Sequence, residues 1–225
     1  MNKKDVIAID GPSGAGKSTI AKKISELLGY EYISTGAMYR LIGLLAFENG
    51  IFDNDEKIKI FCENVEKKIE LHHGKIYFSG VDFTEKVYEN KVSMLASDIS
   101  KRPFVRNILG RLQREIGLKQ KSVLEGRDIG TVIFPDAKYK FFIDASPEVR
   151  AKRRYEELKE RGEKVEFDSL LKEILKRDEN DSSREIAPLK RAEDAIYIDT
   201  SHLTVDEVVD EIITHVRGDN GNQNG

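Results

Sequence analysis

The segment Gly11–Ser18, with the sequence GPSGAGKS, is the feature that most constrains how this chain can fold. It matches the pattern G-x-x-x-x-G-K-[ST] at every fixed position. An apolar run, VIAID, precedes it, and apolar residues at helical spacing follow it from Ile20 to Leu28. Small residues between a strand and a helix let consecutive backbone N–H groups turn toward one anion, and the helix N-terminus adds a positive dipole end. The sequence therefore predicts a phosphate-binding loop at a strand-to-helix junction.

Five short runs of β-branched and aromatic residues predict the strands of one sheet: residues 6–10, 30–34, 123–128, 140–145 and 196–200. Polar and apolar residues do not alternate in these runs, which is typical of strands covered on both faces. Helical patterns lie between them, and the last one has a valine- and isoleucine-rich face after Thr204. Strands that alternate with helices predict an α/β fold with a doubly wound, parallel, five-stranded sheet and right-handed connections.

Two segments interrupt this alternation. Residues from about 52 to 98 include KKIELHHGKIYFSG, which predicts a β-hairpin turning at His73-Gly74 within a substrate-side insertion. Residues from about 150 to 186 are helical and dense in charge and break at Gly162, which predicts a helical hairpin serving as a lid. The polar end, 218–225, is expected to be disordered. The sequence thus predicts one domain over residues 1–217.

Composition restricts the kinds of partner. The 225 residues carry 37 Lys and Arg against 40 Asp and Glu, a net charge of −3, so neither nucleic acid nor a membrane surface is expected as a partner. Cys62 is the only cysteine, which excludes an internal disulfide and favours a reducing compartment. No apolar stretch approaches the roughly 20 residues of a membrane span. We expect a cytoplasmic, monomeric protein with small-molecule substrates.

The phosphate loop predicts a site for a nucleoside triphosphate. The residues expected to bind it are Gly11, Pro12, Ser13, Gly14, Ala15, Gly16, Lys17, Ser18 and Thr19. Lys17 is expected to reach the β- and γ-phosphates, and the Ser18 hydroxyl to hold Mg²⁺. Asp144 and Asp199, at the ends of two predicted strands, are candidates for an acidic partner of the metal, but neither is decisive.

Several classes of protein share such a loop, including GTPase switches, motor ATPases and small-molecule kinases. A GTPase should carry an N-K-x-D guanine-binding motif, and the nearest match, Asn90–Ser93, ends in serine. Arginines occur beyond the predicted strand ends and in the charged hairpin: Arg40, Arg106, Arg127, Arg177 and Arg184. Because the planar guanidinium binds two phosphate oxygens at once, this set favours a phosphorylated second ligand and phosphoryl transfer over a switch.

Together, five segments resemble the bacterial cytidylate kinases, which are nucleoside monophosphate kinases: AIDGPSGAGKST, STGAMYR, EGRDIGTVIFPDA, KRDENDSSREIAPL and AEDAIYIDTS. They occur in the family's order and cover nearly the whole chain. The resemblance implies transfer of the ATP γ-phosphoryl group to CMP or dCMP with Mg²⁺, which gives the diphosphate and ADP. The alternatives are a kinase of the same fold acting on UMP, AMP or shikimate, and a nucleotide-binding regulatory module.

The resemblance also implies roles for individual residues. It places Thr35, Arg40, Arg127 and Arg184 at the acceptor phosphate, Arg177 and Asp181 at the sugar hydroxyls, and Ser97, Arg106 and Asp128 at cytosine. Lys17, Arg127 and Arg184 are the residues expected to be catalytic. Thr35 departs from the serine associated with its position but keeps the hydroxyl. Arg150 is the first candidate to contact the transferred group, ahead of Arg153 and Arg154.

Overall fold

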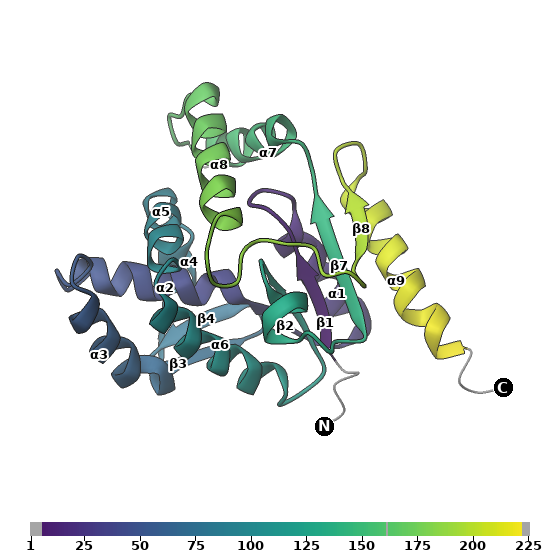
Figure 1. The fold of residues 1–225 in the computed structure, drawn as a ribbon. Helices are drawn as coiled ribbons and strands as arrows, with labels where there is room; N and C mark the ends of the chain where they lie inside the picture. Colours follow the sequence, from purple (N-terminus) through teal and green to yellow (C-terminus); the bar gives the residue numbers. More distant parts are fainter. Residues whose placement is uncertain (1–5, 161, 222–225) are drawn as a thin grey trace.

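The computed structural model describes residues 6–160 and 162–221, which form an α/β fold around one parallel sheet (Figure 1). Its strands are β1 (Val6–Asp10), β2 (Glu31–Ser34), β6 (Ser122–Gly126), β7 (Tyr139–Asp144) and β8 (Ile196–Asp199). Their order in the sheet is β2-β6-β1-β7-β8, and every adjacent pair is parallel. The predicted five-stranded, doubly wound parallel sheet is therefore confirmed.

The strands form where the sequence lacks alternation because both faces of the sheet are covered. All residues of β1 and β6 are buried. On one face, α1 (Lys17–Leu28) and α9 (Val205–Gly221) pack their apolar sides, including Ile20, Ile24 and Ile212, against the sheet. On the other face, Phe134 belongs to the cluster that contains Val6, Ala8 and Leu124. A sheet covered in this way leaves the carboxyl ends of its strands as the exposed edge at which ligands bind.

The insertion forms a second, three-stranded antiparallel sheet and several helices, which share an apolar core with α2 (Thr35–Glu48). Its elements are α3 (Asp55–Val65), the 3₁₀-helix η2 (Glu66–Lys68), β3 (Ile69–His72), β4 (Lys75–Phe78), β5 (Val81–Asp82), α4 (Thr84–Val87) and α5 (Asn90–Ile99). The predicted hairpin is present: β3 pairs with β4 through His73 and Gly74, whose φ angles are 50° and 75°. Two positive φ angles are what a tight two-residue hairpin turn requires.

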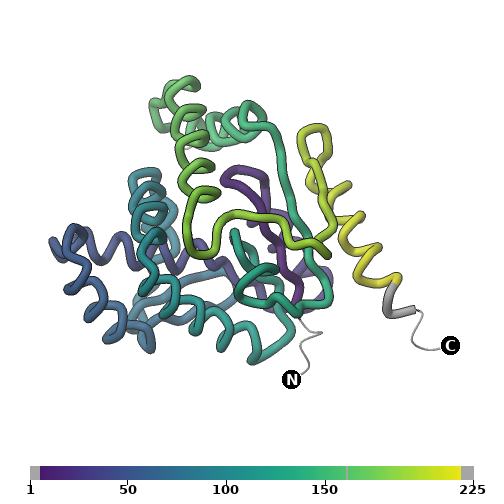
Figure 2. The backbone as a smooth tube through the Cα atoms, viewed as in Figure 1, coloured from purple at the N-terminus to yellow at the C-terminus, as the bar shows by residue number. Residues whose placement is uncertain are grey.

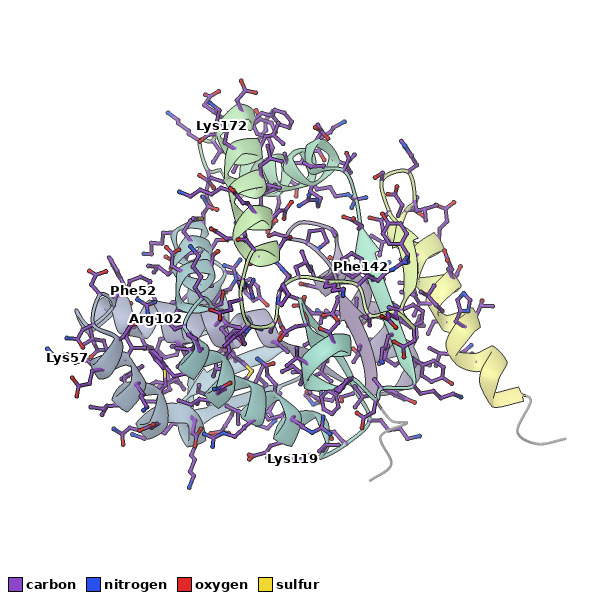
Figure 3. All side chains as sticks on the ribbon, in the orientation of Figure 1. Phe52, Lys57, Arg102, Lys119, Phe142 and Lys172 are labelled. Atoms are coloured by element: carbon purple, nitrogen blue, oxygen red, sulfur yellow. The ribbon has the colours of Figure 1, made fainter. Side chains whose placement is uncertain are left out.

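Helix α6 (Pro103–Gly117) returns the chain from the insertion to the central sheet. Arg102, just before it, donates to Asp55 at the start of α3 (2.6 Å) and to the backbone carbonyl of Phe52 (2.8 Å), and its guanidinium lies over the Phe52 ring. Figure 3 shows Arg102 and Phe52 side by side at the start of α3. At the β8 edge of the central sheet, Phe142 of β7, labelled in Figure 3, stacks on Tyr197 of β8.

The charged segment forms a helical hairpin of α7 (Pro147–Glu160) and α8 (Phe167–Ser182), which stands above the strand ends (Figure 2). The chain turns at Gly162, whose φ of 76° suits glycine. Tyr155 of α7 contacts Phe167 of α8 edge-to-face. The predicted hairpin is present, and its closure as a lid stays a prediction.

The last helix begins as predicted and ends later than predicted. Thr204 and Glu207 form a reciprocal cap: Thr204 N–H donates to the Glu207 carboxylate (2.8 Å), and Glu207 N–H donates to Thr204 Oγ1 (3.3 Å). Helix α9 continues to Gly221, and 222–225 lie outside the described residues, so the expected disorder of the tail stays a prediction. A helix anchored by its apolar face extends readily because each added residue closes one more hydrogen bond. In the described part of the chain, no helix combines the length and apolar character needed to cross a bilayer.

Candidate functional site

The phosphate loop joins β1 to α1 at the carboxyl edge of the sheet. Gly11 has a φ of 148°, and a Cβ atom there would lie 1.9 Å from the Ile143 carbonyl oxygen, so glycine is required. Lys17 is buried, and its Nζ donates to the Pro12 carbonyl within the same loop (2.6 Å). Burial, with the charge of Arg127 nearby, lowers the pKa of Lys17 to about 7. The charged form of Lys17 is disfavoured in these surroundings, and a nearby anion such as a triphosphate would stabilise it.

A single pocket of about 860 Å³ extends from this loop beneath the α7–α8 hairpin. It is lined by residues 13–19 of the loop and by all nine residues expected on the acceptor side: Thr35, Arg40, Ser97, Arg106, Arg127, Asp128, Arg177, Asp181 and Arg184. Gly11 and Pro12 lie behind the lining. Segments more than 160 residues apart in sequence therefore meet around one space.

Asp181 is the centre of a buried cluster of charges. It accepts from Arg127 Nε (2.8 Å) through one carboxylate oxygen and from Arg184 through the other. Burial alone would raise the pKa of Asp181, but the charges of Arg127, Arg177 and Arg184 outweigh burial and lower it to about 2. One carboxylate thus holds two guanidinium groups against the pocket, and the cluster keeps net positive charge.

Arg40 and Arg177 supply the rest of that positive charge. Arg177 Nη1 donates to Ser93 Oγ (2.7 Å), and Arg40 donates to Ser93 Oγ (3.4 Å) and to the Val87 carbonyl (3.0 Å). Burial lowers the pKa of Arg177 to about 9 and that of Arg40 to about 10. The acceptors of these hydrogen bonds are neutral, so both guanidinium groups retain full capacity to pair with an anion.

At the far end of the pocket, Arg106 Nη2 donates to Asp128 Oδ2 (2.5 Å), and both side chains are buried. The Arg106 guanidinium also lies over the Tyr39 ring. Arg106 Nε and the neighbouring buried Ser97 hydroxyl have no hydrogen-bond partner within the described residues. A buried polar group without a partner costs about 1–3 kcal/mol. This end is therefore suited to a ligand with hydrogen-bonding edges.

The Thr35 hydroxyl is engaged with the backbone: its Oγ1 donates to the Glu125 carbonyl (2.8 Å). Its contact with the acceptor phosphate stays a prediction. Thr35 is also the first residue of α2, and the first N–H groups of a helix have no intrahelical acceptor. Those backbone groups, with Arg40 one turn later, form the part of α2 that faces the pocket.

Glu125 is a site residue that the sequence analysis missed. It is buried near the end of β6, it lines the pocket, and its Oε1 accepts from Ser18 Oγ (3.2 Å) and Ser34 Oγ (2.6 Å). Mg²⁺ prefers oxygen ligands, and proteins hold it through one or two carboxylates besides water and phosphate. Ser18 and Glu125 together fit such an ion. The sequence feature that could have identified Glu125 is the acid in VLEGRD, near the end of a strand that lies beside β1.

Asp144 and Asp199, the candidates for an acidic partner of the metal, bond to backbone near their own strands. The carboxylate of Asp144 accepts from Ala145 N–H (2.8 Å), and that of Asp199 accepts from Ser201 N–H (2.9 Å). Neither residue lines the pocket. Asp199 therefore caps the turn that follows its strand, a common role for aspartate, and Asp144 bonds the backbone next to it.

Arg150, preferred from the sequence as a contact of the transferred group, does not line the pocket. Its guanidinium donates to the carbonyls of Ala145 (2.9 Å) and Ser13 (3.0 Å) and to both oxygens of Asp178. Arg153 and Arg154 do line the pocket. Arg153 donates to Thr200 beside the phosphate loop, whereas Arg154 donates to Asn90 of the insertion. In this structure Arg150 is held away from the pocket by Asp178 of α8, and which of the three arginines contacts the transferred group stays a prediction.

Comparison with known proteins shows the family of this chain. The family model described as cytidylate kinase matches residues 7–218. The chain belongs to the cytidylate kinase family. A cytidylate kinase of Thermosipho melanesiensis is 47% identical over 94% of this chain and 96% of that protein, and one of Caldicellulosiruptor saccharolyticus is 48% identical over 94% and 95%. The resemblance drawn from the sequence segments is thereby confirmed.

Among solved structures, an uncharacterized protein from Eubacterium ventriosum matches with a TM-score of 0.49 at 18% identity, covering 94% of this chain and 98% of that one. Membership of the cytidylate kinase family therefore rests on the family model and on the similar sequences. The pocket described above lies within the matched residues.

Proposed function

We propose that this chain transfers the γ-phosphoryl group of ATP to CMP or dCMP, producing ADP and the nucleoside diphosphate. The observation that carries the proposal is the continuity of one pocket, which has a phosphate loop at one end and a buried Arg106–Asp128 pair at the other. Among the described residues, six further arginines line the same pocket: Arg40, Arg127, Arg153, Arg154, Arg177 and Arg184. The names of the similar proteins support cytidine monophosphate as the acceptor.

The donor end binds ATP through the backbone of residues 13–16 and through Lys17. Mg²⁺, held by Ser18 and Glu125 with the phosphates, would neutralise phosphate charge during transfer. Lys17 exchanges its hydrogen bond with Pro12 for the phosphates. Arg153 and Thr200 lie at the donor side of the pocket.

The acceptor end binds the nucleotide by its phosphate and its base. Arg40, Arg127 and Arg184 hold the acceptor phosphate in line with the donor, and Arg177 and Asp181 meet the sugar. At the base, the Asp128 carboxylate accepts from the cytosine N4 amino group, and Arg106 and Ser97 satisfy N3 and O2. Uracil reverses the polarity of two of these positions, so it would leave buried groups unpaired.

The arrangement supports action as a monomer, since one chain supplies every residue named above. The α7–α8 hairpin, over about 150–186, closes over both nucleotides and excludes water, which suppresses ATP hydrolysis. A cytoplasmic location, a single domain over 1–217 and independence from nucleic acid complete the proposal.

A panel of acceptors tests this function. With ATP, we expect ADP release in a coupled assay to require an acceptor, and CMP or dCMP to give a kcat/KM at least about 10²-fold above UMP or AMP, because mispaired acceptors leave buried polar groups unsatisfied. Preferential turnover of UMP, AMP or shikimate would support the kinase of the same fold instead. Release of ADP without any acceptor dependence would support a regulatory module.

ATP binding should take up a proton near neutral pH. The pKa of Lys17 is about 7 in the described structure because of its burial, so at about pH 8 the amine is mostly neutral. The phosphates favour the charged amine, so binding at that pH should capture up to about one proton. Calorimetry in buffers of different ionisation enthalpy measures this number. The control is Lys17→Arg, which is already charged and should capture none; an equal value in both proteins would contradict the role of Lys17.

A further inference from the structure

The segment after Asp128 is a single-turn π-helix, η3 (Ile129–Ile133). The N–H groups of Ile133 and Phe134 donate to carbonyls five residues earlier, those of Asp128 (3.1 Å) and Ile129 (2.7 Å). Isolated π-helical turns are rare and concentrate at functional sites. The first N–H groups of such a turn need an acceptor from outside it, and here they are buried, so water cannot supply one.

Asp10 supplies that acceptor from another element. It is the last residue of β1, next to Gly11 of the phosphate loop, and it is buried. Its Oδ1 accepts from Ile129 N–H (2.8 Å), and its Oδ2 accepts from Gly130 N–H (2.7 Å). Burial raises the pKa of Asp10 to about 7, although these two hydrogen bonds act in the opposite direction. A carboxylate that is costly to bury therefore caps a short helix elsewhere in the chain.

The residue that would ordinarily cap η3 is Asp128, and it does not. Asp128 occupies the N-cap position, but its side chain makes no capping hydrogen bond. An aspartate at this position usually accepts from an N–H of the first turn. Here its carboxylate instead accepts from Arg106 at the base end of the pocket. Asp10 therefore caps η3, and the Asp128 side chain remains at the base end of the pocket.

We infer that Asp10 is a positioning residue for base recognition: by capping η3 from β1, it leaves the Asp128 carboxylate free to pair with Arg106 and to read the acceptor base. The inference rests on the proposed function, since it concerns the same base end. It also means that the strand leading into the phosphate loop holds the base-reading loop in place. Nucleotide contact is not required of Asp10, which lies outside the pocket lining.

The test is Asp10→Asn. The asparagine oxygen can still accept one N–H, but its amide group presents donors to the other, so one N–H of η3 loses its acceptor. Asp128 is then expected to turn and cap its own helix. We expect the ratio of kcat/KM for CMP to that for UMP to fall by about 10- to 150-fold, the factor that corresponds to losing one hydrogen bond to a charged group. ATP affinity by calorimetry should change much less than this ratio, because no residue that lines the donor end of the pocket is replaced.

Two controls separate positioning from general damage. Asp144→Asn removes a carboxylate from the end of β7, the strand beside β1, and should leave the CMP-to-UMP ratio unchanged. Asp10→Asn made in an Asp128→Asn background should cause no further fall in the ratio, because its effect passes through Asp128. An additional, independent fall in that background would overturn the inference.

If Asp10→Asn folds poorly, the crystal structure of a second variant tests the same inference. Asp10→Ser offers one hydroxyl oxygen to the same N–H groups, and its crystal structure should show the Asp128 carboxylate turned onto the first turn of η3. Asp128 still paired with Arg106 in a variant lacking the carboxylate would overturn the inference. If the unaltered protein shows no preference for CMP, the proposed function fails; if it does and Asp10→Asn keeps the full ratio, only the role of Asp10 fails.

Discussion

Replacing Arg184 with alanine should lower kcat for CMP phosphorylation by about 10³-fold, the low end for an arginine that stabilises charge in phosphoryl transfer. ATP affinity should remain within about twofold, because we propose that Arg184 contacts the acceptor and not ATP. The Arg184 side chain is almost fully buried beside Asp181, and its Nε has no partner within the described residues. Asp181 keeps its hydrogen bond from Arg127 in the variant, so the cluster is not left without a counter-charge.

Single-turnover kinetics and calorimetry with an ATP analogue measure these two quantities separately. Arg111→Ala is the matched control: Arg111 is exposed and pairs with Glu66 on the insertion, so both quantities should stay unchanged. Equal losses of kcat and ATP affinity in Arg184→Ala would mean that the residue acts on the donor or on folding, and would remove it from the catalytic set.

The second large effect concerns Arg106 and Asp128. Arg106→Met should lower kcat/KM for CMP by about 10²-fold or more and bring the CMP and UMP values close together, because the groups that distinguish the two bases are lost. The same change leaves Asp128 buried without its cation, and breaking a buried pair costs about 3–5 kcal/mol of stability. A selective loss must therefore be separated from a loss of folded protein.

A double replacement makes that separation. Arg106→Met combined with Asp128→Leu removes both charges, so it should regain much of the unfolding free energy lost in Arg106→Met. It should not regain preference for CMP. Urea unfolding and the acceptor panel measure the two properties on the same preparations. If CMP and UMP rates fall by the same factor in Arg106→Met, the base-reading role is wrong.

Local patterns predicted the elements whose form depends on neighbours in sequence. The phosphate loop follows from small residues between a strand and a helix, and the β3–β4 hairpin follows from a turn at His73-Gly74 that tolerates positive φ. The arginines were predicted as a set because the carboxyl ends of parallel strands meet at one edge. The pocket brings that set together.

What the sequence could not indicate depends on partners distant along the chain. The sequence alone does not show that the Arg150 guanidinium is already paired. Its partner, Asp178, lies on the other helix of the hairpin. Besides β1, which ends at Asp10, three of the described strands of the central sheet end at or near an acid, and only the structure shows that Glu125 accepts from Ser18 while Asp144 and Asp199 do not. The sequence likewise cannot show that Asp10, and not Asp128, caps η3, because this depends on η3 lying beside β1 in the fold.

The hydrogen bonds of Arg150 have a mechanical consequence. One buried guanidinium joins the start of α7 to the Ser13 carbonyl and, through Asp178, to the C-terminal half of α8. A rigid swing of the whole hairpin would break these charge-assisted contacts, each worth about 1.5–3 kcal/mol. If the hairpin closes as proposed, we therefore expect it to bend farther out, toward Gly162, while its base stays joined to the phosphate loop through Arg150.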